Sequence, residues 1–389
     1  MRIRITVHRF RPDVGGTELM AEMLASSMVD RGHEVEVITL RTGAAAPEEW
    51  VRVPAIPGTE GGPRRYRVRR LDFLRAPVRV PVGYWRALRQ PTDVLHVFGN
   101  RIWNSDFFLP IAGWLPAPKV MTGQNFYQYH LHPSPLNSLY FRRYFPRMIR
   151  RVNCYVVQTV QEREQIRGLG YTGRLELIPH TIDLREFPTD GTGGPGFRAR
   201  HGLGSDLVLV STGGYAPNKR MDRLVEAVAQ ARSRWKLVLA GKDWPGHPAD
   251  LASVRTLAAR LAVPVLFLGD GAPVPRDELI AALESADAYA QGSSYEGYGG
   301  GIQEAMAVQR PFVAFETGAV SEFAAAGAGL SVRTVEEFAH ALDRLAASDT
   351  ERRAMGAAGR TDVVAHRSLD VTMAAYDRVF REVEPSGRP

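Results

Sequence analysis

The sequence predicts an α/β protein of two domains in tandem, each a doubly wound parallel sheet, facing each other across a cleft. Short β-branched runs alternate with helical apolar patterns along most of the chain. The connections between them are short, which favours parallel strands covered by helices on both faces. A chain of 389 residues also exceeds what one hydrophobic core usually supports. Ligands of such sheets bind at the carboxyl ends of the strands, so we expect the chemistry in the loops that follow strands.

The first domain is predicted to span residues 1–187. Between its first two strands, Leu19, Met23 and Met28 have helical spacing, so this segment reads as a strand, a helix and a strand. The charged residues 64–70 alternate with apolar ones, which predicts an exposed strand. The other predicted strands cover residues 3–7, 34–40, 94–98, 155–158 and 176–178.

Residues 188–196 are rich in Gly and Pro and are predicted to form an irregular linker. The second domain is predicted to span residues 197–367, and a last helix at 368–384 is expected to pack back onto the first domain. Its strands are predicted at residues 207–211, 236–240, 265–268, 288–291 and 312–315, and its helices at 220–231, 249–261, 278–285 and 301–307.

The composition is that of an ordinary globular protein, with 44% hydrophobic and 23% charged residues, which excludes a disordered or fibrous chain. No apolar run reaches the roughly 18 residues of a membrane span, and no signal peptide is recognisable at residue 1, so we expect a cytoplasmic protein. The single cysteine, Cys154, lies in an apolar run and is expected to be a buried, inert thiol.

Charge is distributed unevenly, with 26 basic and 15 acidic residues in 1–180 and an acidic excess beyond. This asymmetry favours an acidic or phosphorylated ligand, or an anionic membrane surface. No nucleic-acid-binding motif accompanies it, so a nucleic-acid partner is not expected.

Two predicted loops carry glycines or cations directly before a helix. Gly15 and Gly16 allow either a tight turn or an approach of backbone N–H groups to an anion at the helix start. In the second domain, Lys219 and Arg220 precede a helix and are either two solvated charges or a pair that holds a diphosphate.

A third loop, residues 293–301, is rich in glycine and leads into a predicted helix. Glu296 and Glu304 lie eight positions apart on either side of its glycines. Carboxylates are the usual acceptors for pairs of sugar or ribose hydroxyls, and glycines expose backbone donors. This pattern predicts a sugar-nucleotide site, because clustered glycines around one acidic residue serve no packing purpose.

Taken together, these loops resemble those of the GT-B glycosyltransferases, specifically the large retaining family four. Glu296 and Glu304 match the two ends of that family's paired-glutamate motif, and residues 178–183 with Phe187 are similar to the segment that precedes the family's second domain. Gly15 and Gly16 match its acceptor-side glycine loop. The resemblance covers nearly the whole chain and implies two Rossmann-like domains, with sugar transfer from a nucleotide-diphosphate-sugar donor to a hydroxyl.

The resemblance also implies residue roles. Glu304 would hold the ribose, Glu296 the donor sugar, and Lys219 with Arg220 the diphosphate, and the catalytic group would be Glu296, Lys219 and Arg220. The implied donor-binding residues are Gly16, Gly214, Lys219, Arg220, Glu296, Tyr298, Gly299, Gly300 and Glu304, and the implied acceptor-binding residues are Gly15, Gln124, Asn125 and His130.

Two positions depart from the family pattern. Gly214 stands where an Arg is common, which shifts diphosphate neutralisation toward Arg220. Gln124 stands where a His is common, and a Gln cannot shuttle a proton. His130 and His132 follow in the same segment, either as substitutes or as exposed side chains. No Asp-x-Asp occurs, so we expect a site that needs neither a metal nor a further cofactor.

The sequence is compatible with more than one acceptor and with more than one reaction. Residues 137–152 read as a basic amphipathic helix that packs on its own domain or makes peripheral contact with an anionic membrane at its inner surface. A glycan, a lipid-linked molecule and a natural product are all compatible acceptors. A nucleotide-sugar 2-epimerase on the same fold, or a degenerate subunit that only binds the nucleotide sugar, are the rival functions, and turnover with and without acceptors separates them.

Overall fold

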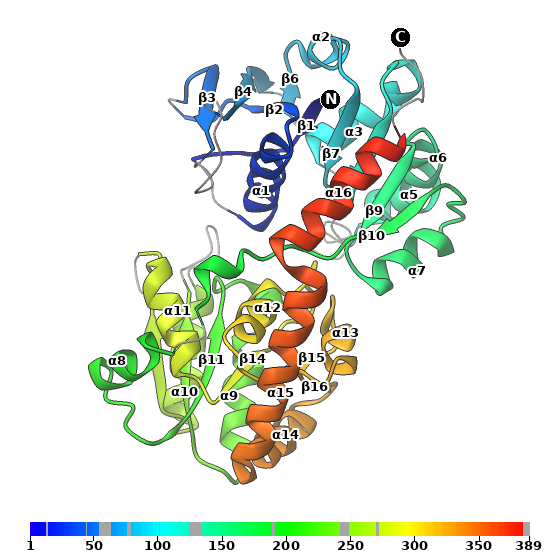
Figure 1. Cartoon of the computed structure of the whole chain (residues 1–389). Coiled ribbons are helices and arrows are strands. Elements are labelled where there is room, and N and C mark those ends of the chain that lie inside the picture. The colour runs from blue at the N-terminus through cyan, green and yellow to red at the C-terminus, as the bar shows by residue number, and fades with distance from the viewer. Residues whose placement is uncertain are drawn as a thin grey trace. The chain divides into compact units, whose positions relative to one another are not determined.

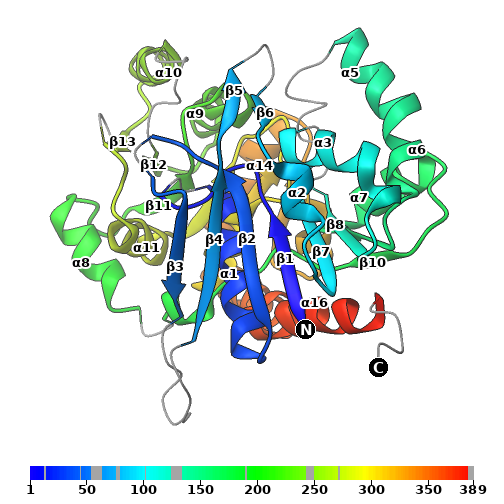
Figure 2. The same ribbon diagram turned by 90° about the horizontal axis from the view of Figure 1, so that it is seen from above.

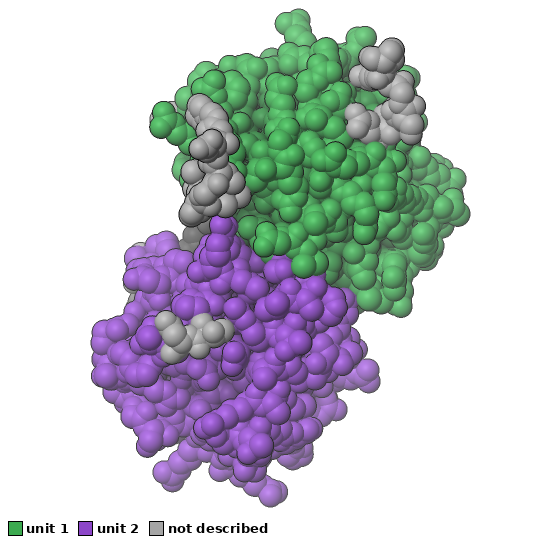
Figure 3. Space-filling model, viewed as in Figure 1, with its two compact units in different colours: residues 1–181, 369–389 green, residues 182–368 purple. Residues whose placement is uncertain are grey.

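The computed structural model of the protein describes residues 1–12, 15–43, 45–53, 64–75, 79–100, 102–123, 134–188, 191–241, 249–269 and 272–383. The chain forms two compact units (Figure 3). Unit 1 contains Met1–Thr181 and Leu369–Pro389, and unit 2 contains Ile182–Ser368. Each unit has its own, mainly parallel sheet covered by helices, which confirms the predicted fold class.

Unit 1 is built on an eight-stranded sheet with the order β10-β9-β8-β7-β1-β2-β4-β3 (Figure 1). Neighbouring strands are parallel except β3, which is antiparallel to β4 at the edge. The hairpin of β5 (Phe73–Arg75) and β6 (Arg79–Pro81) is separate. The sheet strands are β1 (Arg2–Thr6), β2 (Glu34–Leu40), β3 (Glu48–Arg52), β4 (Arg65–Leu71), β7 (Val94–Phe98), β8 (Lys119–Thr122), β9 (Cys154–Val157) and β10 (Leu175–Leu177).

Helices cover both faces of this sheet. On one face α1 (Gly16–Asp30) and α16 (Leu369–Val383) pack side by side over a core that includes residues of β1, β2, β4 and β7 (Figure 2). A second core forms on the other face, under several short helices. These are α2 (Tyr84–Leu88), α3 (Trp103–Ile111) with the turn η1 (Ala112–Trp114), η2 (Tyr140–Tyr144), α6 (Phe145–Ile149) and α7 (Val160–Gly168). The short helix α5 (Pro135–Leu139) precedes η2 and buries no residue.

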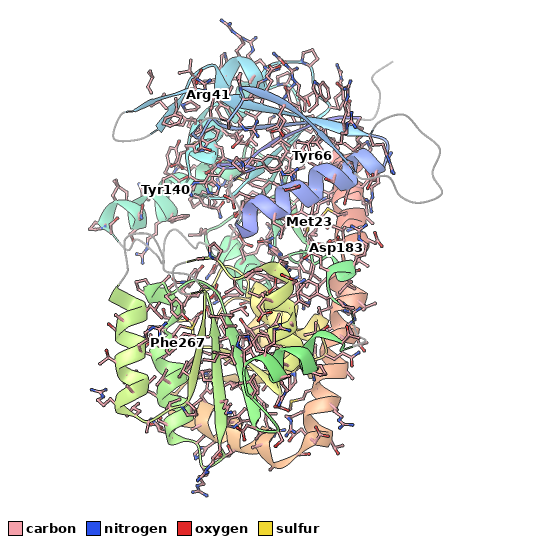
Figure 4. The ribbon with its side chains drawn as sticks, turned by 90° about the vertical axis from the view of Figure 1, so that its left-hand side faces the viewer. Met23, Arg41, Tyr66, Tyr140, Asp183 and Phe267 are labelled. Atoms are coloured by element: carbon pink, nitrogen blue, oxygen red, sulfur yellow. The ribbon has the colours of Figure 1, made fainter. Side chains whose placement is uncertain are left out.

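The predicted strand at residues 64–70 is confirmed by β4, but its predicted exposure is wrong, because β4 lies inside the sheet. β3 pairs along its outer edge, and alternate side chains are buried: Tyr66 and Val68 lie in the α1 core, where Met23 packs against it (Figure 4). Arg70 is also buried, and it pairs with Glu49 (2.6 Å). On the other face, Arg67 and Arg69 pair with carboxylates, whereas Arg65 is exposed and lies over the ring of Trp50.

The predicted single helix at residues 137–152 is also wrong in its details. The segment is a helix, a π-helical turn and a second helix, α5, η2 and α6. Helical spacing predicts an apolar stripe of Leu139 or Tyr140, Tyr144, Met148 and Val152. The buried stripe instead consists of Phe141, Phe145, Ile149 and Val152. The aromatic residues supply most of the packing against the sheet, so the apolar and basic side chains share the exposed surface.

Unit 2 has a six-stranded, fully parallel sheet with the order β13-β12-β11-β14-β15-β16. The strands are β11 (Leu207–Thr212), β12 (Trp235–Ala240), β13 (Val265–Leu268), β14 (Ala288–Gln291), β15 (Phe312–Phe315) and β16 (Gly329–Val332). The strand order reverses between β11 and β14. In open parallel sheets, this is the point where the loops after the strands diverge and leave room for a ligand.

Two hydrophobic cores lie against this sheet, one lined by α9, α10 and α14 and the other by α8, α11, α12, α13 and η5. The bounds are η3 (Leu184–Glu186), α8 (Gly193–Arg200), η4 (Pro217–Lys219), α9 (Met221–Gln230), α10 (Ala249–Arg260), α11 (Arg276–Ser285), α12 (Gly300–Ala307), α13 (Val320–Ala325), α14 (Val335–Ala347), α15 (Asp349–Asp362) and η5 (Val363–Arg367).

The chain between the units differs from the prediction. Unit 2 begins at Ile182, not after Phe187, and the predicted linker 188–196 is wrong at its end, because α8 begins at Gly193. Gly194 lets α8 approach α11: a Cβ at this position would clash with the Glu284 carbonyl. A Gly-rich run that looks unstructured by composition is therefore a close helix contact.

Two smaller expectations concern single features. Cys154 is fully buried on β9, which confirms the predicted burial of its thiol, and this burial raises the thiol pKa to about 12. Within the described ranges, no helix is long and apolar enough to cross a bilayer.

Candidate functional site

The loops after β11 and β14 are joined to each other in unit 2, at the strand-order reversal. The backbone N–H of Ser294 donates to the carbonyl of Asn218 (2.8 Å), and Asn218 Nδ2 donates to the carbonyl of Tyr295 (3.2 Å). Gly292 lies so close to this partner loop that a Cβ there would clash with the carbonyl of Arg220. The two loops thus form one surface, and residues 76 and 77 positions apart in the sequence become neighbours.

Glu296 is the centre of this surface. Lys219 Nζ and Ser293 Oγ both donate to its Oε1, each at 2.6 Å. Its backbone N–H donates to Thr317 Oγ1 (3.0 Å), in the loop after β15. The Glu296 side chain is 10% exposed and the Lys219 side chain 27%. Three post-strand loops therefore position Glu296, and its carboxylate accepts hydrogen bonds from a lysine ammonium and a serine hydroxyl.

Glu304 lies one helical turn into α12 and is paired with a cation from another element. Arg276 Nη1 donates to Glu304 Oε1 (2.7 Å), and the same guanidinium contacts Glu186 Oε2 through Nε (3.1 Å) and Nη2 (3.0 Å). Arg276 also lies over the ring of Phe187. Burial raises the pKa of Glu304, and the Arg276 charge opposes that rise. A ligand hydroxyl that donates a hydrogen bond to this carboxylate must share the carboxylate with Arg276.

The start of α12 lies between these two carboxylates in sequence. Gly299 caps the helix with φ +108°, a conformation that favours glycine, and Gly300 has open space where a side chain would be. Gly301 packs on β11 and β14, because a Cβ there would clash with the Tyr289 hydroxyl and Thr212 Oγ1. The first N–H groups of a helix attract anions, so the predicted Gly299 and Gly300 stand where a phosphate or a sugar oxygen is favoured.

Three other predicted donor residues have different surroundings. The guanidinium of Arg220 pairs with Asp222 (2.9 Å through Nε, 2.7 Å through Nη2), which raises its pKa. Gly214 is half-buried in the loop after β11. Tyr298 does not line the site: its ring lies in the core on Phe323, and its hydroxyl bonds to Arg367. The prediction that Tyr298 contacts the donor is wrong for its side chain.

In unit 1, Gly15 and Gly16 stand at the start of α1, after β1. A Cβ on Gly15 would clash with the Glu18 carboxylate, and one on Gly16 would lie 4.0 Å from His180 Nε2. Burial lowers the pKa of His180, which keeps its ring neutral near pH 7. His8 lies 3.4 Å from Glu18 Oε1. The predicted Gln124, Asn125 and His130, with His132, lie outside the described residues.

Sequence reasoning missed Ser293, Thr317 and Arg276. Ser293 and Thr317 each follow a strand, and that position was a usable signal. Arg276 begins α11 and is brought to Glu304 only by the packing of α11 beside α12, for which no pattern existed. Among the residues that the structure describes, no group of three or more His, Cys, Asp or Glu side chains is arranged to hold a metal ion.

Comparison with known proteins matches most of the chain to two family models. The family described as Glycosyltransferase Family 4 matches residues 14–186, and the family described as Glycosyl transferases group 1 matches residues 206–348. A GDP-mannose-dependent alpha-(1-6)-phosphatidylinositol monomannoside mannosyltransferase of Mycobacterium tuberculosis is 32% identical over 223 residues, which cover 54% of this chain and 56% of that protein. The match thus spans little more than half of that enzyme's length.

Other relatives extend over more of the chain. A D-inositol 3-phosphate glycosyltransferase of Kineococcus radiotolerans is 28% identical and covers 89% of this chain and 85% of its own length. The structure of sucrose-phosphate synthase from Thermosynechococcus elongatus aligns with a TM-score of 0.80 at 19% identity, over 99% of this chain and all of that one. At that identity, the structural match shows the shared fold.

Proposed function

The chain belongs to family 4 of the GT-B glycosyltransferases, and we propose that it transfers a sugar from a nucleotide-diphosphate-sugar donor to a hydroxyl group of an acceptor. One observation carries this proposal: Lys219 and Glu296, from two loops of unit 2, are in contact beside the glycine-capped start of α12. A cation, a carboxylate and free helix N–H groups are the three groups that a diphosphate joined to a sugar requires.

In this proposal each group has a distinct task. Glu304 accepts the ribose hydroxyls, and Glu296 accepts hydroxyls of the donor sugar while Ser293 and Thr317 hold it in place. Lys219 and the α12 N–H groups bind the diphosphate, and Arg220 joins them by leaving Asp222. As the bond between sugar and phosphate breaks, negative charge grows on the departing phosphate, and the positive groups already facing it stabilise that charge.

Three finer features belong to the proposal. The cations Lys219 and Arg220 supply the charge that a metal would otherwise provide, so transfer proceeds without one. The acceptor attacks from the side that the diphosphate leaves, with retention at the sugar. The acceptor proton passes to the departing phosphate oxygen, which needs no protein base.

We further propose that the acceptor carries phosphate. The names of the two relatives given above both contain an inositol phosphate, as phosphatidylinositol monomannoside in one and D-inositol 3-phosphate in the other. Residues 1–180 of this chain carry 26 basic and 15 acidic residues, a balance that favours an anionic acceptor. An inositol phosphate and a phosphoinositide share this chemistry, and assays with each distinguish them.

Calorimetric titration with UDP, GDP, ADP and dTDP in EDTA tests the donor site without knowledge of the acceptor. We expect one nucleotide to bind selectively, with Glu304→Ala weakening the binding. A folded protein that binds none of the four refutes the donor site, and binding that appears only after a divalent metal is restored refutes metal independence.

Turnover then separates the reactions. Release of nucleoside diphosphate that depends on a phosphorylated polyol indicates transfer, and conversion of the donor without any acceptor indicates the epimerase. Nucleotide binding with neither activity indicates a binding subunit.

A further inference from the structure

The segment that contains α5, η2 and α6 has an unusual charge pattern. Residues 134–153 contain five arginines and no Asp or Glu. All five are exposed, and within the described parts of the chain none has an ion-pair partner. Several other arginines of unit 1 do pair with carboxylates, as Arg4 does with Glu36 (2.7 Å). The five are Arg142, Arg143, Arg147, Arg150 and Arg151.

Large apolar side chains are exposed in the same region. Leu136 is 67% exposed and Leu139 58%, both on α5, while Trp114 at the end of η1 is 74% exposed. Arg151 Nη1 donates to the carbonyl of Pro110 (2.7 Å), which ties the residues after α6 to the end of α3, next to η1. Trp114 is therefore close to the basic segment although it is distant in sequence.

Buried apolar side chains, two of them aromatic, pack this segment onto the core of unit 1. Phe141, Phe145 and Ile149 are buried, and Tyr140 (labelled in Figure 4) donates through its hydroxyl to Asp106 (2.7 Å). The Asp106 carboxylate thus accepts a hydrogen bond from a tyrosine of the segment. Figure 2 shows α5 and α6 along the outer edge of unit 1, beyond β8 and α7. The exposed cations and apolar groups are therefore presented by a packed support.

We propose that this surface, the arginine-rich segment 134–153 together with Trp114, binds the headgroup layer of an anionic lipid bilayer. Two kinds of exposed side chain point to this partner. The arginines are attracted to anionic headgroups, and Trp and Leu side chains enter the boundary between headgroups and acyl chains. An acidic protein or a nucleic acid would account for the cations and leave three large apolar side chains in water without a role.

The surface binds independently of sugar transfer, so its test needs no donor or acceptor. Vesicles of phosphatidylcholine are prepared with and without phosphatidylglycerol, and protein that sediments with them is measured at low and high salt. We expect binding only to the anionic vesicles, and weaker binding at high salt. Because one basic residue near an anionic surface strengthens binding about fivefold, Arg143→Gln/Arg147→Gln/Arg150→Gln should weaken it about a hundredfold.

A matched control removes the same charge elsewhere. Arg333, Arg344 and Arg353 are exposed arginines of unit 2 that pair with carboxylates, and their triple change to Gln should leave vesicle binding within twofold to threefold. Trp114→Ser/Leu136→Ser should weaken binding roughly tenfold and keep its salt dependence, because it removes apolar anchors alone. Circular dichroism melting confirms that each variant is folded.

Three results would overturn the proposal: no sedimentation of the unmutated protein with anionic vesicles, equal sedimentation with neutral vesicles, or equal losses in the segment variant and the unit 2 control. Because lipid binding is measured without nucleotide, a failure of the donor-site titration leaves this conclusion standing, and the reverse also holds.

Discussion

Lys219→Met separates the two tasks that the structure gives this lysine, which are to neutralise Glu296 and to hold a diphosphate. Lys219 Nζ lies 2.6 Å from Glu296 Oε1, and both side chains are mostly buried. Removing one partner of a buried pair typically costs about 3–5 kcal/mol, because a charge is left without compensation. Ser293 still donates to the same oxygen and Lys219 is partly exposed, so we expect a loss of about 2–3 kcal/mol from the unfolding free energy of unit 2.

A second substitution distinguishes this structural cost from ligand binding. In Lys219→Met/Glu296→Gln no charge is left uncompensated, so most of the lost stability should return. The diphosphate contact stays lost, and since a hydrogen bond to a charged group contributes about 1.5–3 kcal/mol, nucleotide affinity should fall about 10-fold to 150-fold in both variants.

Lys236→Met is the matched control. Lys236 is also a lysine of unit 2, its side chain is similarly exposed, and it pairs with Asp206 (2.9 Å), but it lies on β12 away from the two loops. We expect little change in stability and none in nucleotide affinity. The assays are urea unfolding and calorimetry with the nucleotide identified above. If Lys219→Met binds that nucleotide as tightly as the Lys236 control, the reasoning about the diphosphate is refuted.

Three further outcomes follow from other contacts. Ser293→Ala removes a 2.6 Å hydrogen bond to Glu296, so we expect about tenfold weaker binding of the sugar-bearing donor and an unchanged affinity for the nucleoside diphosphate, which calorimetry with both ligands checks. Arg276→Gln removes the positive charge that opposes the effect of burial on Glu304, so the pKa of Glu304 should rise further. If this carboxylate binds ribose, then on lowering the pH the variant should lose nucleotide affinity at a higher pH than the unmutated protein does. Coinciding profiles of affinity against pH would contradict this. Burial lowers the pKa of His96 from 6.5 to about 3, so between these two pH values the unfolded chain binds a proton that the folded chain does not. The free energy of unfolding should therefore fall as the pH decreases, by about 1.4 kcal/mol per pH unit more in the unmutated protein than in His96→Gln. Urea unfolding at two pH values would show this difference.

The strands and helices of unit 2 were predictable because each is a short apolar or amphipathic run between turns. β14, for example, occupies residues 288–291 as the pattern predicts. The exposure of the charged run 64–70 was mispredicted for a physical reason. Arg67, Arg69 and Arg70 pair with carboxylates of the neighbouring strands β2 and β3, and a period-two pattern does not reveal whether a strand is at an edge or inside a sheet. β4 is an inner strand because β3 pairs along its outer edge, and a single sequence does not place β3 there.

The candidate site divides in the same way. Lys219 and Glu296 were predictable because both follow strands whose carboxyl ends meet at the reversal of strand order. The side chain of Tyr298 was misplaced because a residue inside a glycine-rich loop can still point into the core. Arg276 was missed because its pairing with Glu304 depends on how two helices pack, which is a tertiary property.

The division of the chain into units also constrains the order in which the protein can fold during synthesis. The last helix, α16, supplies Tyr376 and Phe380 to the core of unit 1, and the Tyr376 hydroxyl contacts Thr122 Oγ1 (3.1 Å) on β8. Unit 2 is closed without it, because the N–H of Ile182 at one end donates to the carbonyl of Arg367 near the other (3.0 Å). On the ribosome, unit 2 can therefore complete its fold first. The earlier-made unit 1 waits with an open apolar face until α16 emerges, and in that interval it depends most on chaperones.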